Sequence, residues 1–198
     1  MLYYVIVYRK RFQTLTGREY DQNMSVNVDL DLLLVQKMRM GDEKAFDDFV
    51  TKYYPKILKY CQIHICDCGY AEDMTQETFA RFFRTLKNYK HYGKAVNYLY
   101  VIAANVCNDY YRHKREIPVD ELPEIPDKKT EALYEQIAVR LALEQLPEEL
   151  REAAVLFFIQ EQRQKDIARI LGISLPLVKY RIRRAKELLS DYFSKEGL

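Results

Sequence analysis

The feature that most constrains this fold is a segment near the middle of the chain in which helical patterning stops. Residues 116–130 carry Pro118, Pro123 and Pro126 among acidic side chains, with few apolar residues to pack. This composition is typical of an extended, solvated connection. On both sides of it, apolar residues return at steps of three and four, the spacing of one helix face. The sequence therefore predicts two small helical domains joined by an acidic linker.

Composition agrees with an all-α protein. The 198 residues include only 6 glycines, and 48% of them are hydrophobic. A chain of this length suits one or two compact domains, and scarce glycine favours helices. The formal net charge of +2 is too small to indicate nucleic-acid binding by itself. Any such surface must therefore come from a local cluster of basic residues.

Four segments follow from this pattern. They are an N-terminal extension, a first helical domain, a linker and a second helical domain, at residues 1–28, 29–115, 116–130 and 131–193. Met24 stands just before the first helical pattern, so a native start there is an open alternative. The apolar run at residues 2–8 is too short to span a bilayer, and no small-residue cleavage site follows it. We therefore expect a cytoplasmic protein.

Apolar stripes in the first domain predict helices that close one core. The stripes consist of Phe46, Phe49, Val50 and Tyr53, then Phe79, Phe82, Phe83 and Leu86, then Leu99, Ile102, Ala103, Val106 and Tyr110. Gly41 and Asp42 form a break and a candidate N-cap before the first stripe. Pro55 is expected to kink or end that helix near Tyr54.

The second domain has the pattern of a helix-turn-helix. Gln164–Leu171 predicts a short amphipathic helix, and Gly172 can adopt the left-handed conformation that closes it. Ser174 follows as an N-cap, and Pro176 lies in the first turn of the next helix. That helix has an apolar face of Val178, Ile182, Ala185 and Leu189 and cations at Lys179, Arg181, Arg183, Arg184 and Lys186. A basic helix alone is more often a solvated face, but the preceding helix and turn favour DNA binding.

Short motifs in both domains resemble one protein family. In the second domain they are Leu146-Pro147, Asp166-Ile167-Ala168, Leu171-Gly172-Ile173-Ser174, Val178-Lys179, Arg181 and Arg184-Ala185. In the first they are Ala71-Glu72-Asp73, Gln76-Glu77, Phe79, Leu99-Tyr100, Ile102-Ala103, Asn105 and Asp109. Together they look like the extracytoplasmic-function (ECF) sigma factors of the sigma-70 family, over residues 29–189.

The chain departs from the family pattern at a few positions. Tyr98 stands where the family usually has Trp, and Ala104 stands where Arg is common. Pro176, Leu177 and Tyr180 replace residues that are frequently Gly, Thr and Ser. The last three changes alter the DNA-reading helix, so the promoter sequence stays open.

The resemblance implies a sigma factor that directs core RNA polymerase to promoters and melts promoter DNA. It implies that Asp73, Gln76 and Glu77 dock on the clamp helices of the largest polymerase subunit. It implies no catalysis, no metal, no cofactor and no small-molecule substrate. Family members are often held by a membrane-anchored anti-sigma factor, which would be a further partner.

Two sets of residues are expected to contact promoter DNA. Aromatic rings suit stacking on unpaired bases and cations hold phosphates. The resemblance places the minus-ten contacts at Tyr98, Asn105, Tyr110, Tyr111, Arg112, Lys114 and Arg115. The minus-thirty-five contacts are expected at Ser174, Lys179, Tyr180, Arg181, Arg183 and Arg184. On that second helix, Lys and Arg can neutralise phosphates and reach guanine edges in the major groove.

Other functions fit parts of this sequence. A stand-alone helix-turn-helix transcriptional regulator would bind its promoter duplex without polymerase and would not need the acidic face of the first domain. A thiol or zinc sensor would use Cys61, His64, Cys66 and Cys68, but no C-x-x-C pair occurs and buried free cysteine is the expected state. The histidines show no spacing with a nucleophile or metal ligands, which argues against an enzyme.

Overall fold

The computed structural model describes residues 29–65, 67–116 and 131–195. The first block comprises α2 (Leu30–Arg39), α3 (Glu43–His64), α4 (Cys68–Thr85) and α5 (Ala95–Glu116). The second comprises α6 (Glu131–Glu144), α7 (Glu148–Ala154), a π-helical segment (Val155–Ile159), α8 (Gln164–Leu171) and α9 (Leu175–Lys195). These ranges contain no strand, so the predicted all-α fold is confirmed. The expected N-terminal extension and residues 117–130 of the linker lie outside the described residues.

Aspartates cap the N-terminal ends of α2, α3 and α4. The Asp29 carboxylate accepts hydrogen bonds from the backbone N–H groups of the first turn of α2, at 3.1 and 3.2 Å. Asp42 accepts the N–H of Ala45 at 3.3 Å at the start of α3, after Gly41 turns the chain with a φ of 84°. Asp67 does the same for α4. Each side chain satisfies a backbone donor that the helix itself leaves unpaired.

Pro55 does not end its helix, so of the two outcomes expected from the sequence, a kink or an end, the end is wrong. α3 runs without interruption from Glu43 to His64. A proline inside a helix removes one backbone hydrogen bond and crowds the preceding turn. Tyr53 and Ile57, on either side of Pro55, are both buried in the core. Tertiary burial of this face therefore outweighs the local preference for a break.

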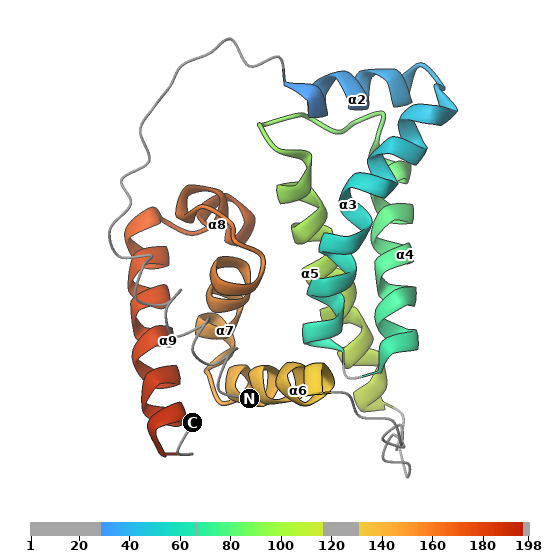
Figure 1. The fold of residues 1–198 in the computed structure, drawn as a ribbon. Helices are drawn as coiled ribbons and strands as arrows, with labels where there is room; N and C mark the ends of the chain where they lie inside the picture. Colours follow the sequence, from blue (N-terminus) through green and yellow to red (C-terminus); the bar gives the residue numbers. More distant parts are fainter. Residues whose placement is uncertain (1–28, 66, 117–130, 196–198) are drawn as a thin grey trace.

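Aromatic side chains from α3 and α4 fill the core of the first block. The rings of Phe49 and Phe82 are fully buried and stacked, with centroids 4.8 Å apart. Leu99 and Tyr100 of α5 are buried as well. α3, α4 and α5 lie alongside one another, and α2 crosses one end of them (Figure 1).

The second block contains the helix-turn-helix at the predicted residues. α8 ends at Leu171, and Gly172 follows in the left-handed conformation with φ 64° and ψ 30°. The apolar residues predicted on one face of α9, from Val178 to Leu189, are all buried. Pro147 occupies the N-cap position of α7 and stands between the end of α6 and the start of α7.

The two blocks pack directly against each other, with α8 lying on α5. Asp166 in the first turn of α8 accepts hydrogen bonds from Lys94 Nζ at 3.1 Å and Asn97 Nδ2 at 3.2 Å. The Tyr100 hydroxyl donates to Gln160 Oε1 at 2.9 Å. Polar side chains therefore tie the N-terminal half of α5 to the second block.

A second contact between the blocks lies at α7. The buried Tyr60 hydroxyl donates to Glu152 Oε2 at 2.9 Å, and His64 Nε2 lies 3.5 Å from Glu152 Oε1. Burial lowers the pKa of His64 against the opposing effect of Glu152. His64 is therefore favoured in its neutral form, and Glu152 is held mainly by the tyrosine.

Candidate functional site

The outer face of α9 carries exposed polar and cationic side chains. Lys179 is exposed, Tyr180 is 52% exposed, and the Arg183 side chain is 73% exposed. Ser174 precedes the helix and its carbonyl accepts the N–H of Val178 at 3.1 Å, the first hydrogen bond at this end. Because the opposite face of α9 is buried, these side chains can only project outward.

Two arginines of α9 are placed differently. Arg181 is only 17% exposed, and its Nη2 lies 3.5 Å from Glu149 Oε2 of α7. Arg184 Nη1 donates to Glu187 Oε2 at 2.9 Å, and Arg183 Nε lies 4.0 Å from Glu187 Oε1. The structure therefore turns Arg181 toward the protein and leaves Arg183 with the weaker of the two contacts to Glu187.

The residues expected at the minus-ten element do not form one cluster. Tyr98 lies in the N-terminal part of α5, and Tyr110 lies twelve residues later, about 18 Å along the helix axis. Asn105, between them, is exposed. The predicted set therefore divides into two sites at opposite ends of α5.

The C-terminal part of α5 carries two tyrosine rings and an arginine close together. Tyr110 packs on Tyr70 of α4 with ring centroids 5.3 Å apart. The Tyr111 hydroxyl donates to the carbonyl of His64, and Arg112 Nη2 donates to Asp109 Oδ1 at 2.7 Å. Lys114 and Arg115 belong to the same helix, but their side chains lie outside the described residues. Tyr111 is thus partly engaged in holding α5 to α3.

Near the other end of α5, a cavity of about 720 Å³ lies between α4, α5 and α8. Its lining includes the cationic side chains Arg84, Lys90, Lys94 and Arg169 and the rings of Tyr92 and Tyr98. No carboxylate lines it in the described part of the chain. Cations beside aromatic rings suit a negatively charged strand with an exposed base.

Of the residues that line this cavity, only Tyr98 was predicted from the sequence to contact DNA. Several lining residues belong to the connection between α4 and α5, residues 86–94. A signal was present there, because Tyr89 and Tyr92 flank Lys90 and His91. Aromatic and basic residues mixed in this way are typical of single-strand binding.

The polar stripe predicted on α4 is present. Asp73 and Gln76 are exposed, and Phe79 and Phe82 are buried on the other side of the helix. Glu77 is already engaged, because Arg81 Nε donates to it at 2.8 Å and Arg84 Nη2 at 3.4 Å. The hydrogen bond from Arg81 lowers the pKa of Glu77 below its usual value. Asp73 and Gln76 are therefore the more available part of this face.

Two of the four cysteines, Cys61 and Cys107, have described side chains. Cys61 and Cys107 are buried free thiols, and a hydrogen bond from Cys107 lowers the pKa of Cys61. The side chains of Cys66 and Cys68 lie outside the described residues. Within the described residues, no group of three or more His, Cys, Asp or Glu is placed to hold a metal ion. No helix in that part of the chain is long and apolar enough to cross a membrane.

Comparison with known proteins decides the family. The model of Sigma-70 region 2 matches residues 49–117, and the model of Sigma-70 region 4 matches residues 136–189. The chain is 32% identical over 170 residues to the ECF RNA polymerase sigma factor SigE of Mycolicibacterium smegmatis, covering 79% of this chain and 66% of that relative. The chain belongs to the ECF sigma factors of the sigma-70 family. It is thus a sigma factor, which directs core RNA polymerase to promoters.

Other relatives agree with this ECF sigma factor in length and fold. RNA polymerase sigma-H factor of Pseudomonas aeruginosa is 30% identical, over 80% of this chain and 91% of that protein. The structure of CnrH in complex with the cytosolic domain of CnrY has a TM-score of 0.71, at 24% identity, and covers 84% of this chain and 99% of CnrH. The sigma factor RpoE of Bartonella quintana, solved with the anti-sigma factor NepR, has a TM-score of 0.63, at 19% identity, over 76% of this chain and 98% of RpoE.

Proposed function

We propose that this ECF sigma factor holds the two promoter elements on two separate surfaces. The outer face of α9 binds the minus-thirty-five duplex, and the cavity beside α5 receives an unpaired base of the minus-ten element. The observation that carries the proposal is the exposure of Lys179, Tyr180 and Arg183 on a helix whose other face is buried. A left-handed turn at Gly172 sets this helix after α8, as in other helix-turn-helix units.

On α9, Lys179 and Arg183 have different roles in DNA binding. An exposed Lys near the start of the helix serves as a phosphate contact, and an Arg fork can meet the paired acceptors of guanine. Tyr180 adds a ring and a hydroxyl next to them. Arg181 contributes through packing, because it is directed to Glu149. A base-reading side chain is worth about 1–3 kcal/mol of discrimination between base pairs.

At the cavity, binding energy offsets the unpairing of DNA. Stacking of one base on an aromatic ring is worth about 1–3 kcal/mol, which is comparable to the few kcal/mol that unpairing requires. Tyr98 and Tyr92 supply the rings, and Lys90 and Arg84 supply positive charge for the backbone. Melting by this route needs no nucleotide hydrolysis and no catalytic site in this chain.

While the two blocks are packed together, the protein cannot bind the minus-thirty-five and minus-ten elements at the same time. Positions minus thirty-five and minus ten lie about 25 base pairs apart, or about 85 Å at 3.4 Å per base pair. Arg169 of α8 also lines the cavity that the minus-ten base would enter. The blocks therefore separate on the promoter. The 14 residues between α5 and α6 (117–130) can reach at most about 50 Å, and the size of each block supplies the rest.

The acidic face of α4 is proposed to dock on the polymerase. Asp73 and Gln76 are exposed and project from a helix whose other face is in the core, so they are free for a partner. Docking on core polymerase places this protein in the cytoplasm. CnrH and RpoE of Bartonella quintana were solved with CnrY and an anti-sigma factor, respectively, which supports an anti-sigma partner for this chain as well.

The test is run-off transcription with core polymerase, together with co-purification. Asp73→Lys combined with Glu77→Lys is expected to abolish both activities while the helical circular dichroism stays unchanged. The matched control is Asp47→Lys with Asp48→Lys, the same charge change at exposed positions of α3. Equal binding by both double variants would contradict the docking face. Promoter-specific binding by the free chain, without polymerase, would favour a stand-alone regulator.

A second test addresses α9. Alanine at Lys179, Tyr180 and Arg183 should reduce transcription from a cognate promoter, and loss of a phosphate contact should make the dependence of affinity on salt shallower. Arg183→Ala should relax preference at one base pair, whereas Lys179→Ala should weaken all sequences alike. Unchanged promoter-specific transcription in the triple variant would place the reading surface elsewhere.

A further inference from the structure

Helix α2 holds the connection between α4 and α5 by side-chain hydrogen bonds at several points. At the start of the connection, Arg39 Nε donates to the carbonyl of Leu86 at 3.0 Å, and its Nη2 donates to the carbonyl of Tyr89. These bonds join residues 47 and 50 positions apart in the chain. A single guanidinium therefore fixes the backbone where the chain leaves α4.

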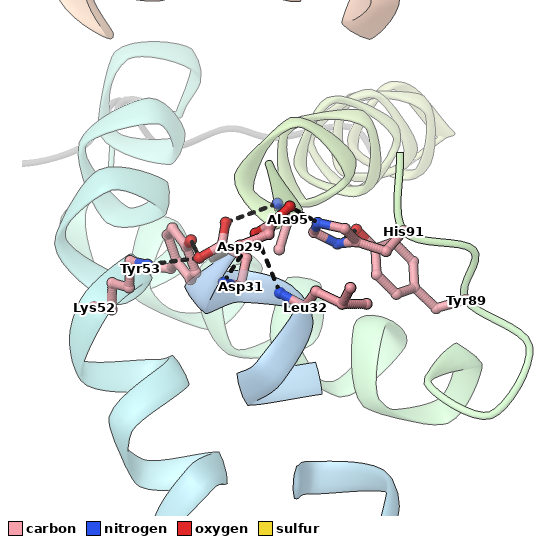
Figure 2. A network of polar contacts seen from close by, with 8 residues as sticks. All are labelled: Asp29, Asp31, Leu32, Lys52, Tyr53, Tyr89, His91 and Ala95. Atoms are coloured by element: carbon pink, nitrogen blue, oxygen red, sulfur yellow. Dashed lines mark hydrogen bonds and ion pairs between the residues drawn. The ribbon is translucent and has the colours of Figure 1, made fainter. Parts of the chain in front are cut away.

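The middle of the connection is held by Asp29 (Figure 2). Asp29 Oδ2 lies 2.7 Å from His91 Nε2, and His91 Nδ1 lies 3.1 Å from the Tyr89 hydroxyl. The other carboxylate oxygen of Asp29 caps α2. One side chain thus ties the start of α2 to two rings of the connection.

The end of the connection is held by Asp31, which is only 7% exposed. Its Oδ2 accepts the N–H of Ala95, the first residue of α5, at 3.1 Å. Its Oδ1 accepts from Lys52 Nζ and the Tyr53 hydroxyl of α3, both at 2.5 Å. Asp31 acts for α5 as an N-cap side chain would, from a helix far away in sequence. The start of α5 is therefore positioned by α2 and α3 together.

The same connection lines the cavity described above. Tyr89, Lys90, Tyr92 and Lys94 contribute to the lining, and the ring of Tyr89 lies 5.2 Å from that of Tyr98. Asp29, Asp31 and Arg39 do not line it. The side chains of α2 and its N-cap therefore act on the cavity indirectly, through the connection and the start of α5.

We propose that Asp29, Asp31 and Arg39, with His91, are positioning residues that set the shape of this connection and so decide which unpaired base the cavity accepts. The proposal rests on the proposed function of the cavity as a base-binding site. Selection among bases depends on hydrogen-bond donors and acceptors held to within about 0.5 Å. Backbone turn hydrogen bonds, from Asn88 N to Thr85 O at 3.0 Å and from Tyr89 N to Leu86 O at 3.4 Å, order the start of the connection. The side-chain hydrogen bonds from α2 and its N-cap add to these and hold the middle and the end of the connection as well.

The experiment uses the sigma factor bound to core polymerase and a panel of fork-junction DNAs. In this panel each unpaired minus-ten position carries each of the four bases in turn. The test variant combines Asp29→Ser, which keeps the cap of α2 because Ser caps as well as Asp but leaves no second side-chain atom for His91, with Arg39→Met, which keeps side-chain length. The control combines Asp67→Ser, the cap of α4, with Lys37→Met, an exposed cation of α2.

We expect the test variant to lose at least tenfold of the discrimination between the best and the worst base at one position. The affinity of the test variant for core polymerase should match that of the control. The contribution of the minus-thirty-five element to DNA affinity should also be the same in both. Arg39→Lys, used in place of Arg39→Met, should recover part of the discrimination between bases. A uniform loss at all positions, or unchanged discrimination, would overturn the positioning role.

A second variant tests whether the cavity is the base-binding site at all. Tyr92→Ala, at a ring that lines the cavity, should also lower discrimination at the same position. If Tyr92→Ala changes nothing while the α2 variant does, the base is bound elsewhere and the cavity assignment is wrong. If Tyr92→Ala lowers discrimination and the α2 variant does not, the cavity stands and the role of α2 is refuted.

Discussion

Replacing Asp166 by alanine should open the contact between the two blocks. The buried Asn97, 8% exposed, donates its Nδ2 to Asp166, and alanine leaves that donor without a partner. An unsatisfied buried donor costs about 1–3 kcal/mol. The pairs with Lys94 and Arg169 add little, because those side chains are 49% and 64% exposed and such pairs are worth about 0–1 kcal/mol. We expect docking to weaken by about 2–3 kcal/mol, or roughly 30- to 160-fold in its equilibrium constant.

The effect is measured by energy transfer between dyes at exposed positions of the two blocks, introduced as unnatural amino acids at Lys59 and Ser190. Asp166→Ala should shift the population toward low transfer. Asp166→Asn should shift it less, because the amide oxygen still accepts from Asn97. Lys165→Ala, an exposed neighbour on the same turn, should leave it unchanged. Equal transfer in wild type and Asp166→Ala would refute the account of docking.

Three further outcomes are expected. Burial favours a raised pKa for Asp31, but its hydrogen bonds from Lys52, Tyr53 and Ala95 lower that pKa below the unfolded value. The free-energy difference between wild type and Asp31→Asn, measured by urea unfolding, should therefore be constant above about pH 5 and shrink as the pH falls below about 4. Gly172→Ala should destabilise the chain by about 1–2 kcal/mol in thermal unfolding, because φ is 64° while space for a Cβ is open. Phe82→Ala should cost about 3–5 kcal/mol in the same assay, since the ring is fully buried and stacked on Phe49.

The sequence predicted those parts of the fold that neighbouring residues encode. Gln164–Leu171 and the turn at Gly172 were predicted residue for residue, because periodicity and a glycine cap act within a few positions. The apolar face of α9 and the polar stripe of α4 follow from the same rule. Pro55 shows where local rules stop, since burial of the helix face overrides the preference of one residue.

The site was only partly accessible from the sequence. Arg181 is cationic and lies in the reading helix, yet only the packing of α7 beside α9 turns it toward Glu149. Tyr98 and Tyr110 belong to one helix and to one predicted set of minus-ten contacts, but their separation of twelve residues along the chain places them about 18 Å apart. The cavity beside Tyr98 needed three helices and a connection to be brought together.

What the sequence by itself determined was helical class, the helix-turn-helix with its turn at Gly172, and the N-cap at Asp42, because each depends on residues three or four apart. Only the tertiary structure decided which partners the buried carboxylates have. Asp31 meets Ala95 across 64 positions, and Asp166 meets Lys94 across 72. No periodicity links such residues, since their meeting depends on how whole helices pack. From its own helix alone, such a carboxylate would be predicted to be a solvated charge. In the folded protein it positions another helix, as Asp31 does, or joins the two blocks, as Asp166 does.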